Sequence, residues 1–214
     1  MLRTIRVLTM SLAVIFPAAG VASSDDKPAE KPKADPPGTP LEVTLTGKKS
    51  TFTLDTAGLS VAEYQKKLEE MVKSGNRPTI APPTVDLTLE IKNTSDKPVT
   101  VWISGDPMVL ELTLKGKNAV NALPKLAFTR EYRVPQGVEI APGKSHAIPV
   151  KALVSGYRGT SKYSYWTDAG EYELVAQLKT GMSPAPKGAK DAGDGFGIVT
   201  VTSAPLKIMV EEKK

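Results

Sequence analysis

One short motif constrains the fold of this chain more than any other feature. Asp168-Ala-Gly-Glu-Tyr172 has the Asp-x-Gly-x-Tyr form that is typical of the corner where a Greek-key sandwich turns into one of its last strands. In such a corner the tyrosine hydroxyl bonds back to the backbone of the turn. The residues that follow, up to Leu178, alternate between apolar and polar, as a strand with one buried face requires. The motif therefore predicts a β-sandwich in which Asp168, Gly170 and Tyr172 form a structural tyrosine corner.

Short segments of alternating pattern, separated by turn residues, continue through the rest of the chain after Pro83. This spacing favours a sandwich over βαβ units. Ala141-Pro-Gly-Lys144 suits a type II turn, because Pro142 and Gly143 occupy the positions that need them. Asn93-Thr-Ser95 matches a glycosylation acceptor, but a turn role explains Asn93 sufficiently. The predicted strands are 85–92, 99–103, 108–114, 125–134, 138–140, 145–153, 171–179, 197–201 and 206–210.

The residues before this region predict a hairpin and one helix. Alternating apolar residues at 41–45 and 52–54 flank a polar loop, which is the signature of a β-hairpin. Ser60-Val-Ala-Glu63 is a capping box, and apolar residues then recur at helical spacing until Gly75. This amphipathic helix is expected on a sheet edge or over one end of the sandwich. We expect one domain over 41–211 with 41–82 as an elaboration, and the alternative is a separate N-terminal subdomain.

Three segments resemble the strand and turn pattern of bacterial immunoglobulin-like domains, of which the bacterial intracellular proteinase inhibitor family is one example. They are Val85–Val99, Ile140–Ser145 and Ala169–Tyr172, within a similarity that runs from Val85 to Leu178. The resemblance implies an all-β, immunoglobulin-like Greek-key β-sandwich, to which the residues before it add one short N-terminal amphipathic helix. It also implies a binding or structural module. It does not carry over inhibition, because the chain has an export signal and no segment that corresponds to a protease-binding loop.

The first residues predict export. Arg3 and Arg6 precede the apolar run Val7–Phe16, and small residues up to Ala22 follow, so residues 1–22 have the form of a secretory signal peptide. An uncleaved anchor is the alternative, but the apolar run is shorter than the ~20 residues of a membrane span. Residues 23–40 are rich in Pro, Lys and Asp and lack large apolar side chains, which predicts a disordered tether. We expect no membrane insertion once the signal is removed.

Composition and isolated reactive residues argue against several functions. The chain has no cysteine, so disulfides, thiolate metal sites and a cysteine nucleophile are excluded. Its net charge is +5, two of these charges leave with the signal, and lysines mix with acids, so we expect no nucleic-acid partner. The single histidine, His146, cannot build a zinc site, and no nucleophile elbow surrounds any serine. Asp191–Gly195 superficially resembles a calcium loop, but Gly193 and Gly195 stand where ligands are needed. We expect no catalytic residue, no metal and no cofactor.

Two segments are candidate contact surfaces. Aromatic residues and arginine cluster between 157 and 166, and these residue types carry much of the energy of protein interfaces and can stack on sugars. The alternative is that the rings cap one end of the sandwich core. The second candidate is the Gly-rich segment Gly181–Gly197, read as a long loop that is either functional or disordered. The residues of the first candidate are Tyr157, Arg158, Tyr163, Tyr165 and Trp166. Tyr163 and Tyr165 are expected to be substantially exposed, and Trp166 at least partly.

These observations favour a non-catalytic, exported binding or structural module of the cell envelope or extracellular space. Its expected partner is a protein or a polysaccharide. A protease-inhibitor-like domain is the alternative, suggested by the resemblance alone. A hydrolase is less favoured, because it would need an acid pair or a nucleophile and base that converge in a pocket, and the sequence places none.

Overall fold

The computed structural model describes residues 38–124, 132–156 and 161–213. In this part of the chain, β-strands and one α-helix account for the regular structure. Many strands have alternately buried and exposed residues, which is the pattern that the sequence predicts for strands with one face in a core. The elements are β1 (Leu41–Gly47), β2 (Thr51–Leu54), α1 (Val61–Ser74), β3 (Thr84–Asn93), β4 (Val99–Ser104), β5 (Val109–Lys115), β6 (Ala119–Ala122), β7 (Gln136–Ile140), β8 (Ser145–Ala152), β9 (Val154–Ser155), β10 (Lys162–Trp166), β11 (Gly170–Ser183), β12 (Lys190–Gly193), β13 (Phe196–Thr202) and β14 (Leu206–Glu212).

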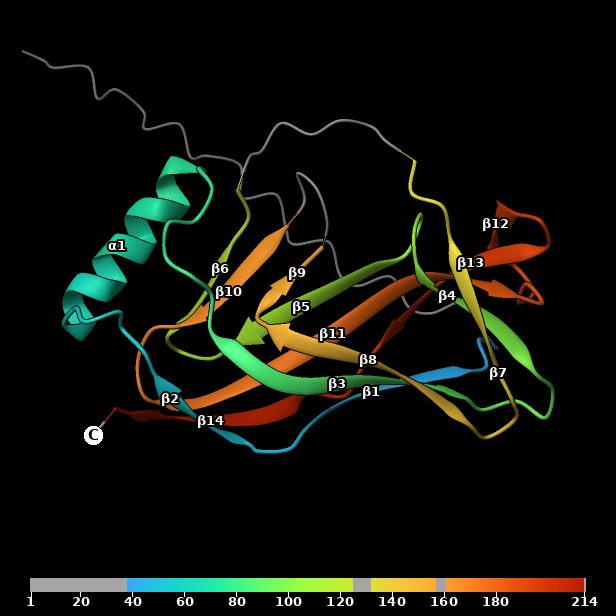
Figure 1. Ribbon diagram of the computed structural model, residues 1–214, viewed down its shortest axis with the longest axis horizontal. Coiled ribbons are helices and arrows are strands. Elements are labelled where there is room, and N and C mark those ends of the chain that lie inside the picture. The colour runs from blue at the N-terminus through green and yellow to red at the C-terminus, as the bar shows by residue number, and fades with distance from the viewer. Residues whose placement is uncertain (1–37, 125–131, 157–160, 214) are drawn as a thin grey trace, which may run out of the picture. The chain divides into compact units, whose positions relative to one another are not determined.

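The strands form an immunoglobulin-like β-sandwich of two main sheets (Figure 1). The smaller sheet has the order β1-β3-β8, and all of its pairs are antiparallel. In the larger sheet, β11 is the central strand: β14 and β13 pair with it on one side, and β5 and β4 on the other. Strands β7 and β2 are edges of this larger sheet. A third, short sheet with the order β6-β10-β9 lies toward one end.

The core lies between the facing sides of the two main sheets. The smaller sheet contributes the fully buried side chains of Leu87, Leu89 and Ile91 from β3. The larger sheet contributes those of Leu174, Ala176 and Leu178 from β11. Burial of such side chains is the main favourable term in folding, so these alternating positions determine which way each strand faces. The fold class expected from the sequence is confirmed.

The predicted hairpin at 41–54 is wrong. Strand β1 pairs with β3 in the smaller sheet, whereas β2 pairs in parallel with β14 in the larger one. The chain between the two strands therefore crosses from one sheet to the other. Alternation predicts two strands correctly here, but it does not specify their partners. Residues 41–54 thus contribute a strand to each layer of the sandwich.

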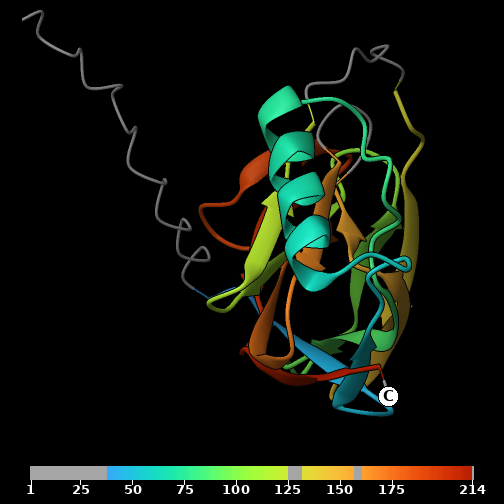
Figure 2. The same cartoon turned by 90° about the vertical axis from the view of Figure 1, so that its left-hand side faces the viewer.

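The predicted helix is confirmed with its capping box. The Glu63 amide donates to the Ser60 hydroxyl oxygen at 3.3 Å, and the Ser60 amide donates to the Glu63 carboxylate at 3.0 Å. Gly75 ends the helix with a positive φ of 65°. Tyr64, Leu68 and Met71 are its buried residues. Helix α1 lies at the end of the sandwich where β2, β6 and β10 lie, as expected for a helix that covers one end (Figures 1 and 2).

The tyrosine corner is confirmed in its geometry. The Tyr172 hydroxyl donates to the carbonyl oxygen of Asp168 at 2.8 Å, and the Asp168 amide approaches the same hydroxyl oxygen at 3.4 Å. Gly170 has a φ of 144°, in the range that favours glycine. The type II turn is confirmed as well, because Lys144 donates its amide to Ala141 and Gly143 has a φ of 68°.

The predicted long loop at 181–197 is wrong over much of its length. Strand β11 continues to Ser183, and β12 pairs with β13 around a tight turn at 194–195. Of the predicted strand at 125–134, residues 125–131 lie outside the described residues, and 132–134 are not in a strand. Four short strands, β6, β9, β10 and β12, were not predicted. None is longer than five residues, which is too short for a clear alternating pattern.

Candidate functional site: a groove beside strand β2

The predicted aromatic contact cluster is only partly a surface. Tyr165 is fully buried and Trp166 is 3% exposed, so the expected exposure of these two rings is wrong. Tyr163 is half-buried. Tyr157 and Arg158 lie outside the described residues. For Tyr165 and Trp166 the alternative interpretation is correct: the rings cap one end of the core.

The burial has a simple cause, because these residues form β10, the central strand of the short sheet. Tyr163 pairs with Ala122 of β6 and with Val154 of β9, so both edges of β10 are used. The Tyr165 hydroxyl donates to the carbonyl oxygen of Ile80 at 2.9 Å, which ties β10 to the segment after α1. A central strand next to a helix leaves little room for an exposed ring.

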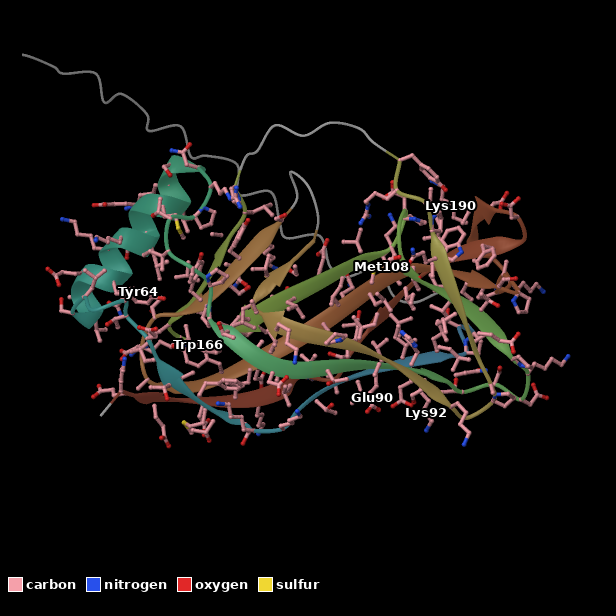
Figure 3. The ribbon with its side chains drawn as sticks, viewed as in Figure 1. Tyr64, Glu90, Lys92, Met108, Trp166 and Lys190 are labelled. Atoms are coloured by element: carbon pink, nitrogen blue, oxygen red, sulfur yellow. The ribbon has the colours of Figure 1, made fainter. Side chains whose placement is uncertain are left out.

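Trp166 lies at the junction of the short sheet and the two-layer core. Its ring lies 5.4 Å from that of Phe52 and 6.4 Å from that of Tyr172, measured between centroids, in tilted arrangements. Such tilted contacts suit the charge distribution of aromatic rings. Trp166 thus joins β2, β10 and the tyrosine corner of β11. Figure 3 shows Trp166 and Tyr64 at the same end of the molecule.

A groove lies next to the rings of Phe52 and Trp166. It has a volume of about 460 Å³, within the range of small ligand sites. One wall is β2 with the residues on either side of it, and the other wall is the segment 79–84. The rings of Tyr64, Phe52 and Trp166 belong to its lining. We call this hollow the β2 groove; its lining residues are Lys49, Phe52, Thr53, Asp55, Ala57, Tyr64, Thr79, Ile80, Ala81, Pro82, Pro83, Thr84 and Trp166.

The β2 wall presents backbone groups that the sheet does not use. The amide of Met209 donates to the carbonyl oxygen of Ser50 at 2.8 Å, and β2 and β14 are parallel, with Met209 opposite Thr51. In a parallel ladder a residue bonds to the two residues that flank its partner, and not to the partner itself. Thr51 and Thr53 are the partners of Met209 and Glu211, so their amides and carbonyls point away from β14. Among the described strands, β14 is the only partner of β2. The free edge of β2 therefore runs along the groove at Thr53.

The floor of the groove is neutral, while charges stand at the two ends of β2. Burial raises the pKa of the Tyr64 hydroxyl to about 12, with the nearby Asp55 carboxylate as a smaller cause. A tyrosine is already protonated at neutral pH, and the raised pKa keeps the Tyr64 hydroxyl neutral further into the alkaline range. The ammonium group of Lys49 lies 5.4 Å from the centroid of the Phe52 ring, and Asp55 accepts the amide of Ala57 at 2.9 Å.

A second hollow, of about 380 Å³, lies where β5, β11 and β14 meet. Its rim carries charges of both signs, from Lys115, Glu171, Glu173 and Lys207. These residues stand on strands that are paired with one another, and β11 is paired on both sides. The backbone beneath this hollow is thus already bonded, so it has no free strand edge. The β2 groove is the better candidate for recognition.

The other sites considered from the sequence do not gain support. His146 lies on β8, an edge strand, opposite Ile91, as expected for an ordinary edge histidine. Asp191 accepts the amide of Gly193 in the β12–β13 turn, which is a structural use of that carboxylate. Within the described ranges, no three or more histidine, cysteine or acidic side chains are grouped so that they could hold a metal ion.

Sequence reasoning identified Trp166 but missed the rest of the groove. Alternation predicts a hairpin for Phe52 and Thr53, and the pattern after Pro83 marks Pro82–Pro83 only as the boundary of the β region. One signal could have found them: an apolar strand, an amphipathic helix and a proline pair follow one another within a short stretch of chain. Their convergence on Trp166, which is far away in the sequence, depends on the crossing between sheets.

Comparison with known proteins finds structural likeness but no match in sequence. No protein family model matches this chain, and no curated protein sequence matches it. Among solved structures, the ASH / PapD-like domain of human CEP192 (PapD-like domain 7) aligns over 90% of this chain and 99% of that chain, with 11% identity and a TM-score of 0.24. At this level of similarity no residue or activity is carried from that domain to this chain. The strand order described above assigns the fold.

Proposed function

We propose that this chain is an exported, non-catalytic binding module, and that the β2 groove is the place where its partner binds. The single observation that carries the proposal is the groove itself: an unpaired strand edge lies beside a neutral aromatic floor. Loops and elements that project from the end of a rigid sandwich commonly carry recognition. The rings of the floor are held in place by the core and by α1, so binding of a ligand costs little conformational entropy of these side chains.

The chemistry of the lining supports binding rather than catalysis. Its ionisable side chains other than tyrosine are Lys49 and Asp55, one amine and one carboxylate. The carboxylate of Asp55 is already held by the amide of Ala57, and the ammonium of Lys49 lies near the ring of Phe52. General acid–base catalysis requires two groups aimed at one reacting atom, often with opposed shifts of their pKa values. The groove offers a surface of recognition instead.

Export is part of the proposal, and it depends on residues 1–22. The charged start, the short apolar run and the small residues up to Ala22 support a signal peptide that is removed. Within residues 38–124, 132–156 and 161–213, no helix is both long enough and apolar enough to cross a membrane. We expect the exported protein to begin at Ser23. Its intact mass tests this directly, and recovery of the full-length chain in the membrane fraction would contradict the cleavage.

Binding at the groove can be followed through Trp166. The chain has two tryptophans, so Trp102→Phe leaves Trp166 as the single reporter. The mature Trp102→Phe protein would be titrated with a panel of linear peptides and oligosaccharides. We expect at least one class to shift the emission of Trp166, because Trp166 lines the groove and a bound ligand changes its surroundings.

A pair of matched substitutions shows where the ligand binds. Ala81 is exposed and lines the groove, and Ala147 is exposed on the edge strand β8 outside it. Ala81→Arg should weaken binding about tenfold or more, which corresponds to about 1.4 kcal/mol, while Ala147→Arg should leave it unchanged. The proposed site would be wrong if every ligand that binds were affected equally by the two substitutions, or by neither.

A further inference from the structure

We propose that the partner is an extended polypeptide segment, which adds to β2 as a new edge strand of the larger sheet. An apolar side chain of this segment would lie on the floor formed by Phe52, Tyr64 and Trp166. This inference rests on the proposed function, because it names the class of ligand that the same groove binds.

The first support is the direction of the backbone groups of β2. Thr53 lines the groove, and its amide and carbonyl point away from β14. An added strand would bond to both of these groups, and main-chain bonds of this kind supply affinity in strand addition. Polar side chains also line the groove, so the preference for a polypeptide over an oligosaccharide rests on the free strand edge.

The second support is the difference between the two walls. The wall opposite β2 contains Pro82 and Pro83, which have no amide hydrogen, and the carbonyl oxygen of Ile80 already accepts from Tyr165. This wall therefore offers mainly apolar contact. A strand bound between the walls would make its backbone bonds to β2 and pack its side chains against the proline wall and the floor.

The third support is a contrast with another edge of the sandwich. Strand β8 is an edge of the smaller sheet and carries Pro149 in its middle, which is a common protection against strand addition. Strand β2 has no proline. Its edge is flanked by Lys49 and Asp55, so the ends of the groove carry opposite charges. We expect the bound segment to place an acidic residue near Lys49 and a basic residue near Asp55, because this arrangement pairs unlike charges.

The experiment begins with a displayed library of random linear peptides, selected on the mature protein. Peptides that bind would then be measured against Thr53→Pro and Thr53→Ala. Proline at 53 removes the amide hydrogen that faces the groove without removing a bond to β14, whereas alanine removes only the hydroxyl and methyl groups. We expect Thr53→Pro to weaken binding about fivefold and Thr53→Ala to change it less than about twofold, since one hydrogen bond contributes about 1 kcal/mol.

A second measurement avoids any dependence on the folding of the proline variant. The selected peptides would be synthesised with N-methyl groups on alternate backbone amides and measured against the unmodified protein. One of the two alternating sets should lose binding, because an added strand uses every second amide. The other set should bind nearly as the parent peptide does.

The outcomes separate this inference from the proposed function. If Ala81→Arg abolishes peptide binding while Thr53→Pro and both N-methylated sets bind as the parent does, the groove binds peptides but not as an added strand. If no peptide is selected and an oligosaccharide shifts Trp166 instead, the polypeptide partner is wrong and the groove remains the site. If peptides bind and neither Ala81→Arg nor Thr53→Pro affects them, both proposals are wrong.

Discussion

Replacing Asn93 with alanine is expected to lower the free energy of unfolding by about 3–5 kcal/mol, because each buried polar group left without a partner costs about 1–3 kcal/mol. The Asn93 side chain is fully buried and makes four hydrogen bonds. Its amide nitrogen donates to the carbonyl oxygens of Lys97 at 2.7 Å and Ile140 at 2.9 Å. Its oxygen accepts from the amide and the hydroxyl of Ser95. Urea unfolding of the mature protein measures the change.

The matched control is Ser95→Ala in the same turn. Ser95 is only half-buried, and its hydroxyl bonds to the side-chain oxygen of Asn93 and to the carbonyl oxygen of Lys97. Loss of this hydroxyl should cost about 1 kcal/mol, the usual contribution of one hydrogen bond. The difference between the two effects reports the bonds that the Asn93 amide nitrogen donates to Lys97 and Ile140, of which the second joins the turn after β3 to the end of β7 in the other main sheet. An effect of Asn93→Ala no larger than that of Ser95→Ala would show that these bonds contribute little.

Gly181→Ala is expected to destabilise the protein by about 2–3 kcal/mol or more, in the upper part of the range for overpacked sites. Gly181 lies in β11 against the ring of Trp102. A β-carbon at this position would come 2.5 Å from Cδ2 and Cζ3 of the ring, closer than any ordinary contact. The ring cannot move away freely, because it stacks on Phe196 at 4.5 Å between centroids. Thermal and urea unfolding would show the loss.

The cause of that loss can be tested with a double substitution. In a Trp102→Ala background the ring is absent, so adding the methyl group at Gly181 should cost much less than it does in the parent protein. The coupling between the two changes measures the contact, as in any double-mutant cycle. Equal costs in both backgrounds would indicate that the backbone of β11, rather than the ring, excludes a side chain there.

Much of the fold follows from local sequence, because the motifs that predicted it are bonded within themselves. The tyrosine corner joins residues four apart, and the capping box joins residues three apart. Asn93 was assigned to a turn, and it bonds to Ser95 and Lys97 in that turn. What local sequence does not contain is the partner of each strand. The crossing between β1 and β2 shows this, since alternation determines which face of a strand is buried but not which strand lies next to it.

Of the candidate site, the sequence predicts one lining residue, Trp166, and not the groove itself. The sequence identified the aromatic residues near the corner, and Trp166 does line the groove. It did not show that Tyr165 and Trp166 lie in a strand with partners on both sides, because β6 and β9 are too short to give a periodic signal. The free edge of β2 is a property of the sheet order. The free edge therefore cannot be predicted from any single segment of the sequence.

The most direct test of the account is the exchange of the Thr53 amide hydrogen with solvent. It would be measured by nuclear magnetic resonance on the labelled mature protein, with and without a peptide selected for binding. We expect this amide to exchange rapidly in the free protein, because it faces the open groove, and slowly when the peptide is bound. If the peptide left the exchange at Thr53 unchanged and instead slowed exchange in β12 and β13 or on the outer face of the smaller sheet, the β2 groove would not be the binding site.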